Sequence, residues 1–196
     1  AGFVDAEATS AKFNAPYSVA LSPTGTFALI SDQLNNRIRR IDINSGVVTT
    51  VAGDGTQSTK EGVGTNARFY APGGICMAEE GRVAYVTERS FLRRIDVSTG
   101  EVTSVVVGNH KANSGADGDY YTQFWKGGGV GWRYGASFST YIGGVSSNHE
   151  SGTRGCVATT IGSAVYVVEQ GWLSRRVRRV EIATRNVTTL VGGEDR

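Results

Sequence analysis

The sequence predicts an all-β fold made of three repeated sheets, each with four short antiparallel strands. Three sequence markers recur in the same order along the chain, and the first of them returns after 56 and then 55 residues. The segments between the markers are short and rich in Val, Ile, Thr and aromatic residues, with turn residues separating them. No window shows the 3.6-residue apolar period that a helix of ten or more residues requires.

Each repeat is marked at its start, its middle and its end. The start is a motif with a central Phe, found at 11–16, 67–72 and, more weakly, 122–127. The middle is an Arg followed by alternating apolar and acidic residues, at 40–43, 94–97 and 179–182. The end is a β-branched run that closes on Gly53, Gly108 and Gly192. Because separate markers keep one order, we infer three copies of one structural unit.

The strands of the first repeat are predicted at Ser18–Ser22, Phe27–Ser31, Arg37–Ile43 and Val47–Ala52. Turn sequences containing Gly25 and Gly46 separate them, and glycine can adopt the positive φ that tight turns need. Four short strands in roughly 55 residues, repeated three times, are typical of the blades of a β-propeller.

The order of these markers resembles the NHL repeat. Residues 2–53 and 54–108 match it over nearly their whole length, whereas the third copy matches well only from about 156 to 193, with Gly127 in place of the Pro and Arg185 in place of the turn Gly. The resemblance implies one blade per repeat, usually in a six-bladed ring. We therefore predict NHL-like blades at residues 1–53, 54–108 and 156–196, with an aromatic, Gly-rich insertion and inter-blade connection at 109–155.

Three blades would form about half of such a ring, as an open arc or as part of a larger ring. An open arc leaves a blade face uncovered at each end. The expected partners are therefore proteins, either further blades of the same parent polypeptide or other copies of this chain, closed in a ring or joined head to tail.

The insertion holds eight of the 18 aromatic residues of the chain. Long connections of this kind are usually functional or disordered, and aromatic side chains argue against disorder. One interpretation is a docking element with partner-binding anchors at Trp125, Trp132, Tyr134, Phe138 and Tyr141. The alternative is a loop folded back over its own blade.

Charged residues recur with the repeats. An acid ends the second strand of each blade, and an arginine lies on the neighbouring strand. We predict cross-strand structural ion pairs within the set Asp32 and Arg40, Glu88 and Arg94, and Glu169 and Arg179. The alternative is a basic stripe that binds RNA, which would use Arg37, Arg39 and Arg176.

The two cysteines, Cys76 and Cys156, fall on the first strands of adjacent blades. Buried free thiols are the expected state, and a disulfide is the alternative. Asn186-Val187-Thr188 is a glycosylation sequon, and Asn186 is expected to face solvent on the outermost strand of its blade. The sequon favours a location outside the cell or at the cell surface.

No catalytic constellation is visible. Both histidines, His110 and His149, fall on connections, so the metal chemistry of the NHL-like amidating lyase is not carried over, and no cofactor or metal is expected. The net charge of +2 is too small to indicate nucleic acid, and no apolar run is long enough to span a bilayer. The sequence thus favours a non-catalytic structural or protein-interaction module, belonging to an extracellular assembly or to a longer multi-domain protein. Alternatives are a ligand-binding or lyase-type propeller whose site lies in other blades, and an RNA-binding propeller.

Overall fold

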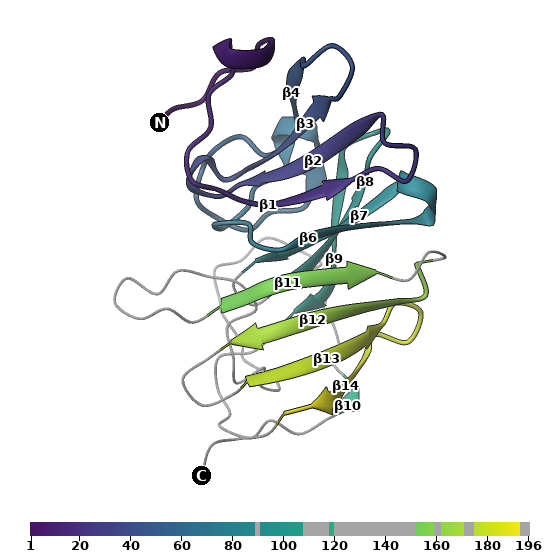
Figure 1. The fold of residues 1–196 in the computed structure, drawn as a ribbon. Helices are drawn as coiled ribbons and strands as arrows, with labels where there is room; N and C mark the ends of the chain where they lie inside the picture. The colour runs from purple at the N-terminus through teal and green to yellow at the C-terminus, as the bar shows by residue number, and fades with distance from the viewer. Residues whose placement is uncertain (89–90, 108–117, 120–151, 159–161, 171–174, 193–196) are drawn as a thin grey trace.

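The computed structural model describes residues 1–88, 91–107, 118–119, 152–158, 162–170 and 175–192. It contains three antiparallel sheets that succeed one another along an open arc (Figure 1). Helical structure in these residues is confined to single turns of 3-10 helix. The predicted all-β fold with propeller-type blades is confirmed.

Blade 1 is a simple meander in which neighbours in sequence are neighbours in the sheet. Its strands are β1 (Pro16–Leu21), β2 (Phe27–Asp32), β3 (Arg37–Asp42) and β4 (Val48–Ala52). The turns between them include Gly25 and Gly46, both at positive φ, and the 3-10 turn η2 (Gln33–Asn35). A further 3-10 turn, η1 (Ala8–Ser10), precedes the sheet.

Blades 2 and 3 repeat this meander. Blade 2 contains β6 (Ile75–Ala78), β7 (Val83–Glu88), β8 (Phe91–Asp96) and β9 (Glu101–Val107), with the 3-10 turns η3 (Gly64–Asn66) and η4 (Glu79–Gly81). Blade 3 contains β11 (Gly152–Ala158), β12 (Ala164–Gln170), β13 (Arg175–Glu181) and β14 (Asn186–Val191). Both sheets therefore keep the strand order of blade 1.

The segment that precedes each blade adds a short strand to the outer edge of that blade. β5 (Gly62–Val63) pairs with β9, and β10 (Gly118–Asp119) pairs with β14. In blade 1 a single bridge between Glu7 and Val47 takes this place. The sequence analysis predicted four strands per blade and missed this one, because two residues are too few to show a periodic pattern. β10 also lies within the range predicted as an insertion.

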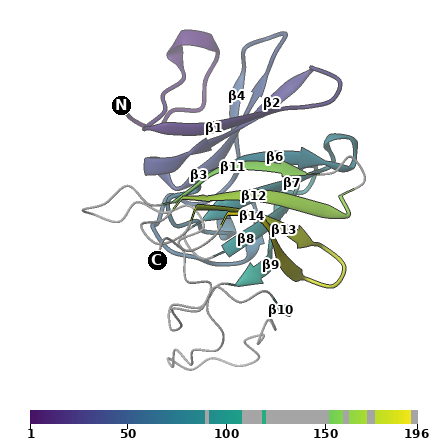
Figure 2. The same ribbon diagram turned by 60° about the horizontal axis from the view of Figure 1, so that its bottom comes forward.

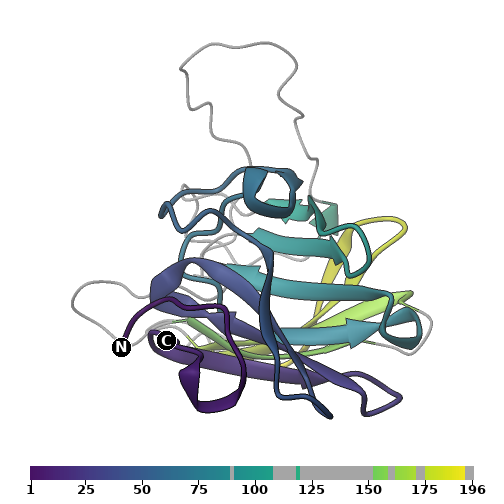
Figure 3. The same ribbon diagram turned by 90° about the horizontal axis from the view of Figure 1, so that it is seen from above.

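The first strands of the three blades, β1, β6 and β11, lie side by side on the inner side of the arc (Figures 1 and 2). β4, β9 and β14 lie toward the outside, and each sheet faces its neighbour rather than joining it edge to edge (Figure 3). Among the described residues, blade 2 has a neighbouring sheet on both faces, whereas blade 1 and blade 3 each have one on a single face.

The core consists of two apolar layers, one in each gap between blades. Between blades 1 and 2, Leu29 and Ile38 pack against Ala84, Val86 and Ile95. Between blades 2 and 3, Tyr85 and Leu92 pack against Val165, Val167 and Val180. Strand alternation supplies both faces of the middle sheet, because successive side chains point to opposite sides.

Candidate interaction faces at the two ends of the arc

Each blade has two faces, which we name by chain direction. The leading face is turned toward the following blade, and in blade 1 it carries Leu29, Ser31, Ile38 and Ala52. The trailing face is turned toward the preceding blade, and in blade 2 it carries Ile75, Ala84, Val86 and Ile95. Strand register gives the equivalent positions in every blade, so exposure can be compared position by position.

The trailing face of blade 1 is exposed at its first strand. Val19 lies opposite Ile30, as Ile75 lies opposite Val86 in blade 2. Val19 is 66% exposed, whereas Ile75 is 3% exposed. Leu21, on the same face of β1, is also exposed. The position is therefore apolar in both blades, and only the neighbouring sheet makes the difference.

The leading face of blade 3 is exposed in the same way. Val168 corresponds to Ser31 and Thr87 in the other blades. Their partners on the third strand are the equivalent residues Val177, Ile38 and Leu92, respectively. Val168 is 43% exposed, whereas Ser31 and Thr87 are fully buried. Val191 is 67% exposed, and its counterpart Ala52 is fully buried. The exposed apolar residues at the two ends are thus Val19 and Leu21 in blade 1 and Val168 and Val191 in blade 3, whereas Ile30 on the same face as Val19 is already buried.

A buried arginine ties the incoming segment to each of the first two blades. Arg39 is fully buried, and its guanidinium donates to Asp32 at 2.8 Å and to Asp5 at 2.6 Å. It also donates to the carbonyl oxygens of Val4 and Lys12. The ring of Phe13 lies 4.9 Å from the same guanidinium. The ring of Phe3 lies at 4.8 Å, so six partners surround one side chain.

Blade 2 repeats this arrangement. Arg93 donates to Glu88 at 2.7 Å and to the carbonyl oxygen of Lys60, and both side chains of the ion pair are fully buried. Burial raises the pKa of the Glu88 carboxyl, and the charge of Arg93 opposes that shift. The backbone N–H of Tyr70 also donates to Glu88. These contacts hold the segment before β6 against its own sheet.

The predicted partners Arg40 and Arg94 are wrong, because they point to the other face of the sheet. Asp32 lies on the same face as Ile30, whose partner on β3 is Arg39. Arg40 lies opposite Leu29 on the leading face and stacks over Phe27 at 4.1 Å.

In blade 3 the predicted ion pair between Glu169 and Arg179 is also wrong, because Arg179 has a different partner. Arg179 pairs with Glu181 at 2.7 Å, on the partly exposed leading side. By register Glu169 shares its face with Arg178, which is buried, and the Glu169 side chain lies outside the described residues.

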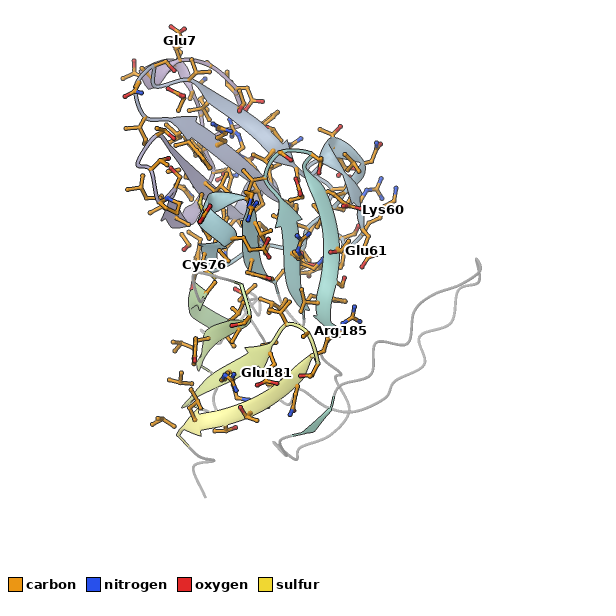
Figure 4. All side chains as sticks on the ribbon, turned by 90° about the vertical axis from the view of Figure 1, so that its right-hand side faces the viewer. Glu7, Lys60, Glu61, Cys76, Glu181 and Arg185 are labelled. Carbon is orange, nitrogen blue, oxygen red and sulfur yellow. The ribbon has the colours of Figure 1, made fainter. Side chains whose placement is uncertain are left out.

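An acid in the incoming segment caps the outer strand. Asp5 accepts hydrogen bonds from the N–H and hydroxyl groups of Thr50, and Glu61 accepts one from the N–H of Ser104 (Figure 4 labels Glu61 at the rim of blade 2). Backbone donors at a sheet edge invite pairing with another strand. Here two of them are occupied by carboxylates of the same chain.

Comparison with known proteins finds similarity to NHL-repeat proteins. No family model matches the chain. NHL repeat-containing protein 2 of Homo sapiens is 28% identical over 125 residues, which are 62% of this chain and 17% of that protein. The Bos taurus protein is 30% identical over 105 residues, covering 52% and 14%. The resemblance to NHL-repeat β-propellers is confirmed.

Solved structures support the same fold. The nidogen/laminin complex gives a TM-score of 0.55 at 11% identity, covering 91% of this chain and 49% of that one. TolB of Acinetobacter baumannii gives 0.52 at 13% identity, covering 92% and 33%. Both neighbours are β-propeller proteins. This chain spans less than a fifth of its NHL relatives and half or less of these structural neighbours.

The remaining predicted site residues have different outcomes. Trp125, Trp132, Tyr134, Phe138 and Tyr141, all predicted as partner-binding anchors, lie outside the described residues. Asn186 was expected to face solvent on the outermost strand of its blade, which is wrong, because β10 pairs outside β14. The Asn186 side chain is half-buried with its Oδ1 enclosed, and its glycosylation stays a prediction.

Cys76 contradicts the expectation of a free thiol. It is disulfide-bonded and lies on β6 near the junction of blades 2 and 3, as Figure 4 shows. An intrachain bond requires Cys156 on β11, since the sequence has no other cysteine. β6 and β11 lie next to each other. The position of the two cysteines on the first strands of adjacent blades was therefore the sequence signal that indicated the disulfide.

The exposed valines of the end faces were not singled out from the sequence. The open arc predicted uncovered faces, and aligning the repeats places Val19 with Ile75 and Val168 with Ser31. That alignment was the signal that could have named these residues. Among the described residues, no helix is long and apolar enough to cross a lipid bilayer.

Proposed function

We propose that this chain is a non-catalytic structural module that binds other proteins through its two end faces. One observation carries the proposal. Val19 and Val168 are exposed at the ends of the arc, at positions that are buried in the blade contacts within it. An exposed apolar patch of this kind marks an interaction site or an aggregation liability.

The non-catalytic part of the proposal rests on the use of the buried charges. The buried acids Asp32 and Glu88 are paired with Arg39 and Arg93. These groups hold connecting segments in place, so their burial has a structural cause. RNA binding is less favoured for the same reason, because Arg39 is fully buried and Arg37 donates to the carbonyl oxygens of Asn35 and Asp54.

We also propose that the module works outside the cell or at the cell surface. The disulfide at Cys76 supports this location, since such bonds persist in oxidising compartments and are rare in the cytosol. The sequon at Asn186 fits the same compartment. The protein could belong to an extracellular assembly or to a longer multi-domain polypeptide, and the end-face proposal holds for either.

Light scattering and binding of an apolar dye test the proposal on the purified chain. We expect the wild type to associate or to bind the dye, and the double variant Val19→Asp/Val168→Asp to do neither. Val63→Asp is the matched control, because Val63 is 51% exposed on β5, away from both end faces. A wild type that stays monomeric without binding dye, or that behaves like the double variant, contradicts the proposal.

A further inference from the structure

Two polar ties join blade 1 to blade 2. The side chain of Asn36 is buried, and its Oδ1 accepts a hydrogen bond of 2.9 Å from the backbone N–H of Ala71. Its Nδ2 donates to the carbonyl oxygen of Gly55 at 3.1 Å. One residue of blade 1 therefore holds the connection to blade 2 near both of its ends. On the inner strands, the Oγ of Ser18 accepts from the N–H of Ile75 at 3.3 Å, which ties β1 to β6.

The tie between the inner strands has no counterpart in the sequence of blade 2. Gly74 is the equivalent of Ser18, because the two residues directly precede the equivalent residues Ile75 and Val19. Glycine has no hydroxyl group, so it cannot accept the hydrogen bond that the side chain of Ser18 accepts.

The Asn36 tie has no counterpart in that sequence either. In blade 1 the turn between the paired Asp32 and Arg37 consists of residues 33–36, and Asn36 is its last residue. In blade 2 the turn between the paired Glu88 and Phe91 is shorter, and its sequence is Arg-Ser. An amide side chain that can donate and accept at the same time is therefore not encoded in this turn of blade 2.

The disulfide of Cys76 lies at the second junction, where blade 2 meets blade 3 (Figure 4). By register Cys76 is on the leading face of blade 2, and Cys156 is on the trailing face of blade 3. The equivalent residues at the first junction are Ala20 and Ile75, which belong to the apolar layer between blades 1 and 2. A covalent bond thus occupies the place where the first junction has two apolar side chains.

We propose that this disulfide is a redox-sensitive lock for the junction between blades 2 and 3. A thiolate of a dithiol reductant attacks one sulfur and forms a mixed disulfide, and the second thiol of the reductant then displaces the protein sulfur. Two electrons and two protons pass to Cys76 and Cys156, which become thiols, while the reductant becomes a disulfide. Because both cysteines of the sequence lie at this junction, the junction between blades 1 and 2 does not respond.

The apolar layer keeps blade 3 on blade 2 after reduction. Its members Tyr85 and Leu92 of blade 2 and Val165, Val167 and Val180 of blade 3 are fully buried. Burial of apolar surface is non-directional, whereas hydrogen bonds and a covalent bond fix the relative position of two sheets. Reduction therefore loosens the junction without unfolding the blades.

Burial of the bond determines when the lock opens. Cys76 is 6% exposed and belongs to the apolar layer. Thiol–disulfide exchange requires the attacking thiolate to reach a sulfur atom. The bond is therefore reduced when the junction opens locally, and such openings become more frequent once the bond is broken.

Hydrogen–deuterium exchange of the whole chain before and after reduction with dithiothreitol tests the lock. We expect exchange in β12 and β13 to become faster by roughly tenfold or more, because local opening of blade 3 costs less free energy without the bond. Exchange in β2 and β3 of blade 1 should stay the same. Reoxidation should restore the original protection. This comparison uses the wild type alone, so no variant has to fold.

Two variants serve as matched controls. Cys76→Ala/Cys156→Ile gives the second junction the residue pair of the first junction, and its exchange should be the same with and without reductant. Asn36→Ala leaves the N–H of Ala71 without its acceptor, so exchange in β2 and β3 should become faster in the oxidised protein. In that variant the reductant should still act on blade 3.

Three results would overturn the proposal. The first is unchanged exchange in blade 3 when thiol titration shows complete reduction. The second is equally faster exchange in all three blades, because reduction then unfolds the chain instead of releasing one junction. The third is a response of Cys76→Ala/Cys156→Ile to the reductant, or wild-type exchange in Asn36→Ala, because the two junctions would then not differ as assigned. None of these results bears on the proposed binding at the end faces.

Discussion

Nη1 of Arg39 lies 2.8 Å from Oδ2 of Asp32, and neither side chain is accessible to solvent. The pair joins β3 to the end of β2, and the same guanidinium also holds Val4 and Lys12 of the incoming segment. Blade 2 repeats the pair with Arg93 and Glu88. One buried arginine therefore fixes both the end of the second strand of a blade and the segment that leads into that blade.

Replacing Arg39 should unfold blade 1 more readily than replacing its neighbour. Arg39→Met leaves the buried Asp32 without its cation, which typically costs about 3–5 kcal/mol in the free energy of unfolding. Arg40→Met is the matched control and should cost less than about 1 kcal/mol, since Arg40 is only half-buried. Chemical denaturation measures both. Equal losses for the two variants would contradict the assignment of the ion pair.

The sequence predicted the acids of these ion pairs but not the arginines. Asp32 and Glu88 stand out because an acid ends a strand in each repeat. Two arginines follow in sequence on each partner strand, and their choice depends on which face of the sheet each side chain points to. That parity is set by the pairing of Ile30 with Arg39, a register that a single sequence does not reveal.

Gly53 should tolerate a methyl group far less than Gly25 does. Both have positive φ, +103° at Gly53 and +70° at Gly25. A Cβ at Gly53 would lie 2.5 Å from the carbonyl oxygen of Asn36, whereas a Cβ at Gly25 would meet nothing within 4 Å. We expect Gly25→Ala to cost about 1–2 kcal/mol, and Gly53→Ala to cost clearly more. Thermal unfolding of the two variants measures the difference, and equal melting temperatures would rule out the close approach.

Asp96 should support stability at acidic pH until its carboxylate is protonated. Hydrogen bonds from the Ser98 hydroxyl and the Thr99 N–H lower the pKa of Asp96 to about 2. In the unfolded chain the pKa of aspartate is about 3.9. Because the folded pKa is the lower one, this contribution is fully present above pH 4 and is lost as the pH falls toward 2.

Carboxyl NMR titration checks this pKa directly. Ser98→Ala removes the hydrogen bond that lowers the pKa of Asp96 most, so the pKa of Asp96 should rise in that variant. Asp96→Asn should flatten the part of the stability curve between about pH 4 and pH 2. An unchanged pKa in the Ser98→Ala variant would show that the turn does not hold the carboxylate. The same turn in blade 1 lowers the pKa of Asp42 through Ser45, which extends the expectation to a second repeat.

The disulfide should make a large contribution to stability. Closing a long loop with a disulfide typically contributes about 2–5 kcal/mol. We expect Cys76→Ser to lower the free energy of unfolding by this amount, and Cys76→Ser/Cys156→Ser to be no worse. Thiol titration of the unreduced, denatured chain should find no free thiol. A double variant much less stable than either single variant would show that the two cysteines are not bonded to each other.

The fold was more predictable than the surfaces that it exposes. Recurrence of the Phe motif and of the closing glycines predicts the blades, and in the contact between blades 1 and 2 a Cβ at Gly53 would lie 3.2 Å from the ring of the buried Phe69. The short outer strand β5 and the exposure of Val19 depend on which segment lies next to which. Such proximity depends on how the blades assemble, and it cannot be predicted from the local sequence.

Footprinting of exposed side chains across protein concentration measures the central relationship most directly. If the ends of the arc are blade contacts without their neighbour, labelling of Val19 and Val168 should fall together as the chain associates, while labelling of Val63 stays constant. If Val19 and Val168 remain equally labelled in the associated state, or if only one of them becomes protected, the end faces are not what holds the molecules together.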